Sequence, residues 1–294
     1  MLGTKIREMR KGLGLSQEQL AGKIGVSRQA VTKWETDAGT PDVENLVELA
    51  RLFGVTVDEL LGNDIATPRD TESGDERALE QSRFINETVC QINEPRRFDI
   101  NFPDARLVRL VGTDGFSVRV LLASDEIEAL GDAAATVFDN QGRGFDIDIK
   151  TIDGISRLDA RTKLDILIEL PNAFASTVEV NGNAERVEVD GVTTENLEFG
   201  SRMKDIDLRG VTGHVGIDSS DEARIRIDPL PWRLDVNQMK ATSRLEIPAG
   251  AAFTTRTRGI GNHIVLEGVA ETEGAEALIE LNGMRSELTI VAAK

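Results

Sequence analysis

The sequence contains few residues of the kinds that build redox centres, metal sites and enzyme active sites. Its 294 residues include one cysteine, Cys90, two histidines and no tyrosine. A single cysteine excludes an intramolecular disulfide and a cysteine-rich zinc site. The histidines, His214 and His263, lie 49 residues apart and outside any HxH or HExxH arrangement. The sequence also lacks a GxSxG nucleophile motif and a phosphate-binding P-loop, so it predicts no metal, no cofactor and no enzymatic activity.

Long apolar runs are absent as well. No stretch approaches the roughly 18 residues needed to span a bilayer, and the N-terminus has no secretory signal pattern. We therefore expect a cytoplasmic protein that has no membrane partner. A chain of 294 residues is long enough for two or three domains.

Positive charge is scarce and concentrated at one end of the chain. The net charge is −17, yet residues 1–36 carry +4, so the remaining 258 residues carry −21. An acidic protein has no general attraction for nucleic acid, and any DNA contact must come from a local basic patch. The first 36 residues provide such a patch, and the duplex should repel the acidic remainder.

The stretch from residue 15 to residue 37 has the pattern of two helices joined by a tight turn. Ser16 precedes Gln19 by three residues, which is the spacing of a helix-capping box. Gly25 can adopt the positive φ that ends a helix, and Ser27 is a favourable N-cap for the next helix. The stretch therefore predicts a helix-turn-helix.

The second helix of this pair separates apolar from polar residues. Val31 and Trp34 are three residues apart and can face a core. The opposite face carries hydrogen-bonding and cationic side chains, namely Arg28, Gln29, Thr32 and Lys33. Arginine can bridge guanine O6 and N7, glutamine can bridge adenine N6 and N7, and a threonine methyl can contact thymine. A solvated helix surface can have the same composition, but the agreement of caps, turn and apolar spacing favours a helix that reads the major groove.

Residues 4–62, TKIREMRKGLGLSQEQLAGKIGVSRQAVTKWETDAGTPDVENLVELARLFGVTVDELLG, resemble the five-helix DNA-binding domain of the lambda-repressor-like family. This family is also called the Xre or Cro/C1-type helix-turn-helix family. The motifs that carry the resemblance are LGLSQEQLA, the recognition helix SRQAVTKWE, the turn with Pro41 and the closing VTVDELL.

The resemblance implies a set of DNA-binding residues. In the family, the glutamine that opens the second helix contacts a phosphate, and the matching residue is Gln17. The base-reading positions match Arg28 and Gln29, with Thr32 and Lys33 one turn later. The loop that follows approaches the DNA backbone through main-chain amides and small polar groups, here Thr36, Gly39 and Thr40. The family often has Asn-Gly-Lys or a similar basic run where this chain has Thr36, Asp37 and Ala38, and the negative charge of Asp37 is unfavourable for a phosphate contact. The complete candidate set is Gln17, Ser27, Arg28, Gln29, Thr32, Lys33, Thr36 and Thr40.

Three further helices are predicted around this pair. The first runs from about residue 4 to residue 11. Another begins after Pro41, and its residues Val43, Leu46, Ala50 and Phe53 keep helical spacing. A last short helix, at about residues 55–61, closes the bundle. We therefore assign residues 1–62 to an all-α DNA-binding domain.

Residues 63–96 have the composition of an acidic linker, with many charges and few large apolar side chains. The spacing of Leu79, Phe84, Ile85 and Val89 predicts a helix within residues 73–89. Such a helix would either form a dimer contact or pack on the next domain.

From residue 97 onward, apolar and polar residues alternate with period two, which is typical of β-strands. Apolar centres recur about every nine or ten residues, separated by Gly, Asn and Asp. Short, evenly spaced strands fit a sandwich, a barrel or a solenoid. The aliphatic repeats, the scarcity of aromatics and the related segments at 168–182 and 245–259 favour a solenoid.

Residues 145–292 are also similar to an adhesin-like β-solenoid domain of bacterial proteins. The likeness rests on the xVEVxG and xIDLxG rhythm and on an LP-A-F motif, and it implies no site residue. We therefore predict a multidomain α and β protein whose residues 97–294 form an all-β, solenoid-like domain. The less regular segment 97–135 would cap the stack.

These observations predict a sequence-specific DNA-binding transcriptional regulator, in the first instance a repressor. One helix-turn-helix reads half a site, so we expect a homodimer on an inverted-repeat operator of double-stranded DNA, with half-sites about 34 Å apart. The β domain would dimerise, or sense an effector or a protein partner. Two alternatives stay open: an autoregulatory antitoxin-like protein, and a protein- or glycan-binding module that the helical domain tethers to DNA.

Overall fold

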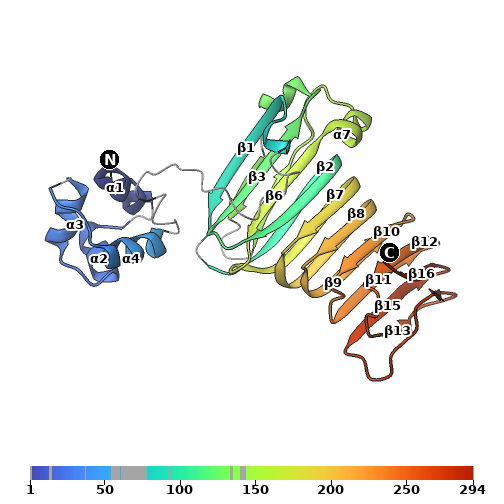
Figure 1. Ribbon diagram of the computed structural model, residues 1–294. Helices are drawn as coiled ribbons and strands as arrows, with labels where there is room; N and C mark the ends of the chain where they lie inside the picture. The colour runs from blue at the N-terminus through green and yellow to red at the C-terminus, as the bar shows by residue number, and fades with distance from the viewer. Residues whose placement is uncertain are drawn as a thin grey trace. The chain divides into compact units, whose positions relative to one another are not determined.

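The computed structural model describes residues 2–12, 15–36, 38–53, 60, 78–92, 94–132, 135–139 and 144–293. The chain divides into two compact units, residues 1–72 and 73–294. Figure 1 shows the first as a group of helices and the second as a stack of strands. The predicted fold class is confirmed, because a helical unit with a helix-turn-helix precedes a large β-sheet unit.

The N-terminal unit contains four named helices among its described residues: α1 (Leu2–Gly12), α2 (Gln17–Lys23), α3 (Arg28–Glu35) and α4 (Val43–Phe53). The predicted caps are present. Ser16 Oγ accepts a hydrogen bond from the Gln19 amide at 3.1 Å, and the Ser16 amide donates to Gln19 Oε1 at 2.8 Å. Ser27 Oγ accepts from the Ala30 amide at 3.2 Å, and Gly25 has a φ of 72°. The helix predicted at residues 55–61 lies outside the described residues, except for Leu60.

The core of the helical unit collects one apolar face from each helix. Its fully buried side chains are Ile6, Leu20, Val31, Leu49 and Leu60. Val43, expected to face inward, is instead 75% exposed, because the inward stripe of α4 begins one turn later. The unit is held together mainly by aliphatic packing between segments that are short on their own.

The second unit consists mainly of strands. Their bounds are β1 (Phe84–Gln91), β2 (Arg96–Thr113), β3 (Ser117–Ser124), β4 (Ala135–Asp139), β5 (Phe145–Ile149), β6 (Asp165–Pro171), β7 (Ala175–Asp190), β8 (Thr193–Arg209), β9 (Thr212–Ser219), β10 (Arg224–Asp228), β11 (Arg233–Met239), β12 (Thr242–Ile247), β13 (Phe253–Thr257), β14 (His263–Glu267), β15 (Ala277–Met284) and β16 (Glu287–Ala292). A 3-10 helix, η1 (Glu128–Asp132), and the helix α7 (Arg157–Lys163) interrupt them.

Most of these strands are the coils of a parallel solenoid. The first half of β8 pairs with β9 and its second half pairs with β10, so one coil contributes to two ladders. Val178 pairs with Leu197, Leu197 with Val215, and Val215 with Leu234, which makes one coil 18 or 19 residues long. The rhythm of nine or ten residues in the sequence is therefore half a coil. All four side chains are fully buried, so aliphatic residues fill the solenoid as predicted.

The coils do not stack in chain order. β15 and β16 pair with β11 and β12 on one side and with β13 and β14 on the other. The last coil of the sequence is therefore inserted between the two coils before it (Figure 1). The loop after β14 lies along β13, where the Thr272 amide donates to the Phe253 carbonyl at 2.8 Å. This contact occupies the Phe253 carbonyl at a sheet edge that could otherwise pair with another chain.

The helix predicted within residues 73–89 is wrong for its C-terminal part, because residues 84–91 are a β-strand. They form β1, which pairs antiparallel with β3 along its whole length. Burial alternates along the strand, and Ile85 and Val89 lie on its exposed face. Backbone pairing with β3 and burial of the other face outweigh the weak helical spacing of these residues. Residues 63–77 lie outside the described residues.

The start of the β unit departs from the parallel pattern, since β3 pairs antiparallel with β6, and β4 with β5.

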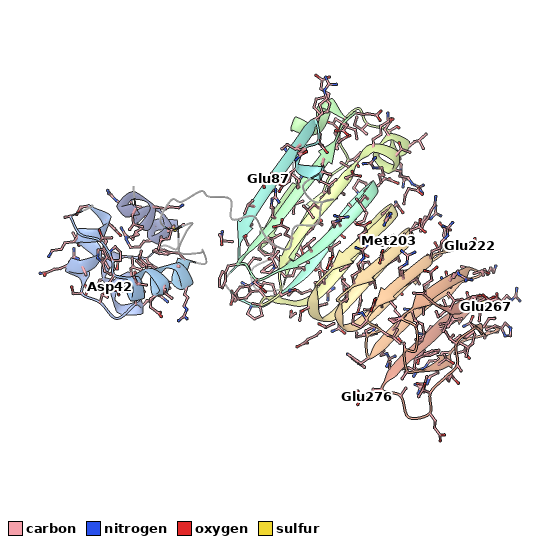
Figure 2. The ribbon with its side chains drawn as sticks, in the orientation of Figure 1. Asp42, Glu87, Met203, Glu222, Glu267 and Glu276 are labelled. Carbon is pink, nitrogen blue, oxygen red and sulfur yellow. The ribbon has the colours of Figure 1, made fainter. Side chains whose placement is uncertain are left out.

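Charged side chains cover the exterior of the coils. Figure 2 shows Glu222, Glu267 and Glu276 pointing outward, whereas Met203 on β8 is only 3% exposed. Within the described part of the chain, no helix is both long and apolar enough to cross a membrane.

Candidate nucleic-acid interface

The helix α3 presents its polar face to solvent. Val31 and Trp34 are buried, whereas the predicted base-reading residues are exposed, namely Arg28, Gln29, Thr32 and Lys33. Thr36 and Thr40 are exposed as well, and Gln17 is half-buried at the start of α2. The caps and the burial of Val31 and Trp34 orient α3, so its outward side chains form one surface.

The hydroxyl groups on this surface are used within the helical unit. Ser27 Oγ caps α3, as described above. Thr32 Oγ1 lies 3.0 Å from the Arg28 carbonyl and 3.1 Å from Gln17 Oε1, and it can donate its proton to either. Thr36 Oγ1 donates to the Thr32 carbonyl at 2.8 Å. These serine and threonine groups therefore fix the shape of the surface more than they offer donors to a ligand.

The longer side chains remain available. The side chains of Arg28, Gln29 and Lys33 form no hydrogen bond or ion pair with any other described residue. Two of them are cationic, and they lie on the helix whose N-terminal amides carry partial positive charge. The arrangement is suited to a polyanion with hydrogen-bonding groups at its surface, which describes the major groove of DNA.

A buried ion pair supports the surface from behind. Arg10 donates from Nε to Glu35 Oε1 at 2.5 Å and from Nη2 to Glu35 Oε2 at 3.1 Å. Arg10 Nη1 also donates to the Leu15 carbonyl at 2.6 Å, just before α2 begins. The Arg10 and Glu35 side chains are only 11% and 2% exposed. The pair therefore ties α1, the start of α2 and the end of α3 together.

Glu35 also positions Gln17. Gln17 Nε2 donates to Glu35 Oε2 at 2.8 Å, while Gln17 Oε1 can accept from Thr32. Burial alone would raise the pKa of Glu35, but hydrogen bonds from Arg10 and Gln17, with the charges of Arg10 and Arg7, lower it overall. Glu35 is therefore a carboxylate at neutral pH and a permanent acceptor for Gln17.

Analysis of the sequence did not identify the roles of Arg10 and Glu35. Both look like ordinary surface charges, since they stand 25 positions apart and belong to different helices. One feature of the sequence could have indicated that Glu35 is buried. It follows Trp34 directly, on the side of α3 that faces the core. The described residues contain no group of three or more His, Cys, Asp or Glu placed to hold a metal ion.

Comparison with known proteins finds sequence similarity in the helical unit. Residues 6–60 match the model of the Helix-turn-helix family. The chain is 44% identical over 70 residues to the HTH-type transcriptional activator BcrR of Enterococcus faecalis, covering 24% of this chain and 34% of BcrR. It is 33% identical over 94 residues to the HTH-type transcriptional regulator ImmR of Bacillus subtilis, covering 32% of this chain and 68% of ImmR.

A solved structure of an adhesin-type protein from Bacteroides fragilis aligns with 71% of this chain and 98% of its own, at 14% identity and a TM-score of 0.42. The chain spans about a third of BcrR, but it covers more than two thirds of ImmR. On the strength of the match at residues 6–60 and of the similarity to ImmR, this protein belongs to the helix-turn-helix family of transcriptional regulators.

Proposed function

We propose that this DNA-binding regulator is a sequence-specific repressor that reads its operator with α3. The observation that carries the proposal is the availability of Arg28, Gln29 and Lys33. These side chains are exposed and unbonded among the described residues, on a helix whose hydroxyl groups are otherwise used. Because these donors have no partner within the described part of the protein, no internal hydrogen bond or ion pair has to break before they meet a base edge.

The proposed roles follow from the chemistry of each side chain. Arg28 and Gln29 read base edges in bidentate fashion, guanine for the first and adenine for the second. Lys33, Gln17 and the loop residue Thr40 approach the phosphates, which sets register without reading sequence. Thr36, whose hydroxyl and amide both donate to the Thr32 carbonyl, shapes the start of this loop. The protein acts on DNA in the cytoplasm and carries out no catalysis.

We further propose that the protein binds as a homodimer through its β unit. A single helix-turn-helix reads only one half-site, and two such helices about 34 Å apart read an inverted repeat. The β unit is large, and it is too acidic to take part in DNA binding itself. Its remaining roles are to bring two helical units together and to sense an effector.

Selection of bound duplexes from a random pool tests the specificity of the full chain. We expect enrichment of an inverted repeat whose half-sites lie one helical turn apart. Light scattering of the full chain should give the mass of a dimer. A pool without an enriched motif would contradict sequence-specific binding, and a monomer that selects a single half-site would contradict the dimer.

A promoter fused to a reporter gene distinguishes repression from activation. The relatives include an activator by name, so the assignment of repressor needs this separate test. We expect a lower reporter signal when the enriched motif overlaps the promoter and the protein is present. A higher signal would reverse the direction of regulation and leave DNA recognition intact.

A further inference from the structure

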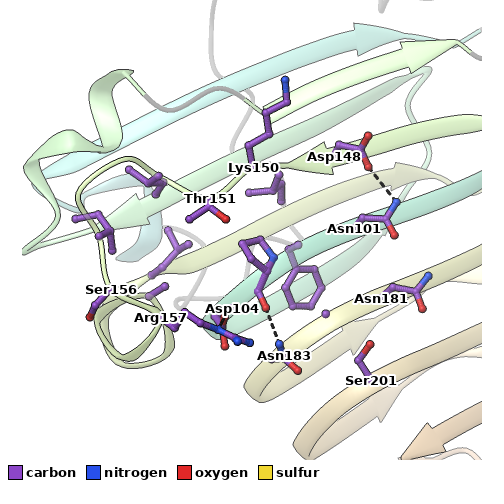
Figure 3. Close-up of a pocket in the computed structure, with 18 residues that line it drawn as sticks. Asn101, Asp104, Asp148, Lys150, Thr151, Ser156, Arg157, Asn181, Asn183 and Ser201 are labelled. Carbon is purple, nitrogen blue, oxygen red and sulfur yellow. Dashed lines mark hydrogen bonds and ion pairs between the residues drawn. The ribbon is translucent and has the colours of Figure 1, made fainter.

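The β unit contains a cavity of about 810 Å³, beside α7 and the bends of β2, β7 and β8 (Figure 3). Pockets for small molecules have volumes of about 300–1,000 Å³. The cavity lies in the β unit and includes none of the residues assigned to DNA recognition. Its lining combines an apolar floor with neutral polar side chains and four charged ones, Asp104, Asp148, Lys150 and Arg157.

A β-bulge forms the floor. Phe102 and Pro103 of β2 lie opposite one residue of β7, Gly182, because the register shifts between Asn101 and Asp104. A Cβ at residue 182 would lie 2.4 Å from the Phe102 ring, so glycine is needed there for the ring to occupy this position. The remaining apolar lining consists of Ile149, Ile152, Ile155, Ala160 and Leu164.

One wall of the cavity belongs to a row of polar residues that crosses the solenoid. Successive strands pair Asp148, Asn101, Asn181 and Gly200. The row continues beyond Gly200. In the next strand, Ile217 pairs with Phe199, and Asp218 follows Ile217. Asp218 pairs with Asn237, and Asn237 pairs with Asn282. Only the first part of this row lines the cavity.

The row is hydrogen bonded on both sides of Asn181 but not at Asn181 itself. On one side Asn101 Nδ2 donates to Asp148 Oδ1 at 3.0 Å, and on the other Asn282 Nδ2 donates to Asn237 Oδ1 at 2.9 Å. Gly200 has no side chain to continue the row. The side-chain amide of Asn181, which is half-buried, and the hydroxyl of Ser201, which is exposed, form no hydrogen bond with any described residue. Figure 3 shows both along the same side of the cavity.

The acidic groups in the lining already have partners. Arg157 Nε donates to Asp104 Oδ2 at 2.8 Å, and Asp148 accepts from Asn101. Beside Phe102, the side-chain groups without a partner among the described residues are the amide of Asn181 and the hydroxyl of Ser201, while the exposed Lys150 and Thr151 also lack one. The amide and the hydroxyl can each both donate and accept hydrogen bonds.

We propose that this cavity binds a small uncharged ligand with several hydroxyl groups and one apolar face, the chemistry of a sugar ring. Ring hydroxyls both donate and accept, so they match the amide of Asn181 and the hydroxyl of Ser201 without burying a charge. The apolar face lies against Phe102, Pro103 and the isoleucines. This inference builds on the proposed sensing role of the β unit, but ligand binding can be measured without DNA.

Calorimetric titration of the full chain with N-acetylglucosamine and with glucose tests the inference. We expect at least one sugar to bind with a Kd of about 1 mM or lower. A titration to about 10 mM, ten times this Kd, should then approach saturation. Asn181→Ala should weaken it at least tenfold, and Thr151→Trp, which fills the cavity from an exposed lining position, should abolish it. Asn237→Ala removes the same side chain from the hydrogen-bonded part of the row and should leave sugar affinity unchanged.

Three results would overturn the inference: no saturable binding of either sugar, equal binding by the Asn181→Ala and wild-type chains, or a clear preference for glucuronate over glucose. The last result would assign the cavity to an anion held by the exposed Lys150 at its rim. Circular dichroism of each variant confirms folding. DNA binding by the same samples is measured separately, so failure of the sugar site and failure of the proposed regulator function give different outcomes.

Discussion

Gln17 Nε2 donates a hydrogen bond of 2.8 Å to Glu35 Oε2, which joins the first residue of α2 to the last residue of α3. The same carboxylate accepts from Arg10 on α1. The side chain that we propose as a phosphate contact is therefore placed by a buried ion pair before DNA arrives. Such positioning reduces the conformational entropy that binding must overcome.

Removing one partner of the buried pair should destabilise the helical unit. Glu35→Gln leaves the Arg10 charge buried without a counter-ion, for which the expected loss is about 3–5 kcal/mol of unfolding free energy. Urea unfolding followed by Trp34 fluorescence measures it, in a Trp232→Phe background so that only the helical unit reports. The matched control is Glu48→Gln, whose 3.1 Å pair with Arg51 is exposed and should contribute less than about 1 kcal/mol. Equal losses in the two variants would contradict a special role for the buried pair.

The stability of the helical unit should fall in acid. Burial raises the pKa of Glu35, but the hydrogen bonds from Arg10 and Gln17 outweigh it, so the folded pKa lies below the ordinary value of 4.5. A lowered carboxyl pKa stabilises the fold above the unfolded pKa, and this contribution disappears as the pH falls from 4.5 through the folded pKa. Trp34 fluorescence across this range should show a loss that is smaller in Glu35→Gln. An identical pH profile in the variant would assign the acid sensitivity to other carboxylates.

Variants of α3 and α2 should affect DNA binding in different ways. Arg28→Ala or Gln29→Ala should weaken operator binding by about 1–3 kcal/mol and relax the preference at one base pair. Gln17→Ala should weaken all sequences alike, since it removes a proposed phosphate contact. Fluorescence anisotropy with the operator and with single-base variants separates these patterns. If the Arg28 and Gln29 variants lose affinity uniformly, the assignment of base readers is wrong.

Thr32 should contact DNA through its methyl group alone. Its hydroxyl proton is directed to the Arg28 carbonyl or to Gln17 Oε1, which leaves the methyl as the outward group. Thr32→Val keeps a methyl and should preserve the base preference. Thr32→Ser removes it and should cost about 0.8 kcal/mol at a thymine position, the value of one buried methylene. Anisotropy with thymine and uracil at the contacted position is the measurement, and a larger loss in Thr32→Val would show that the hydroxyl reads the base.

A glycine in β2 should resist substitution. A Cβ at Gly112 would lie 2.1 Å from the Gly191 carbonyl oxygen and 2.6 Å from Asn172 Oδ1. Gly112→Ala therefore forces a backbone shift, with an expected loss of about 1–3 kcal/mol from the β unit. Gly115→Ala is the control, because a Cβ there would have Thr113 Oγ1 as its nearest neighbour, at an ordinary 3.6 Å. Urea unfolding followed by far-UV circular dichroism should separate the two variants, and similar midpoints would mean that the turn at Gly191 adjusts freely.

The sequence alone determined the helix-turn-helix and the general character of the β unit. The caps at Ser16 and Ser27 connect residues only three positions apart, so they can be recognised without knowledge of the rest of the chain. The alternation of Val, Ile and Leu with polar residues likewise predicts strands, because the side-chain period of a strand is a local property. The exposure of Arg28, Gln29 and Lys33 follows from the same local rules.

Only the tertiary structure decided which distant residues meet. The contact of Arg10 with Glu35 joins separate helices, and the pairing of β1 with β3 replaces a helix that local spacing favoured. The insertion of β15 and β16 between earlier coils, and the unbonded amide of Asn181 at a cavity, depend on the path of the whole chain. The local sequence determines the side-chain periodicity of a strand or helix and the residues that cap a helix. Which distant segments pair depends on the total free energy of packing and hydrogen bonding over the whole chain, and this cannot be read from one segment.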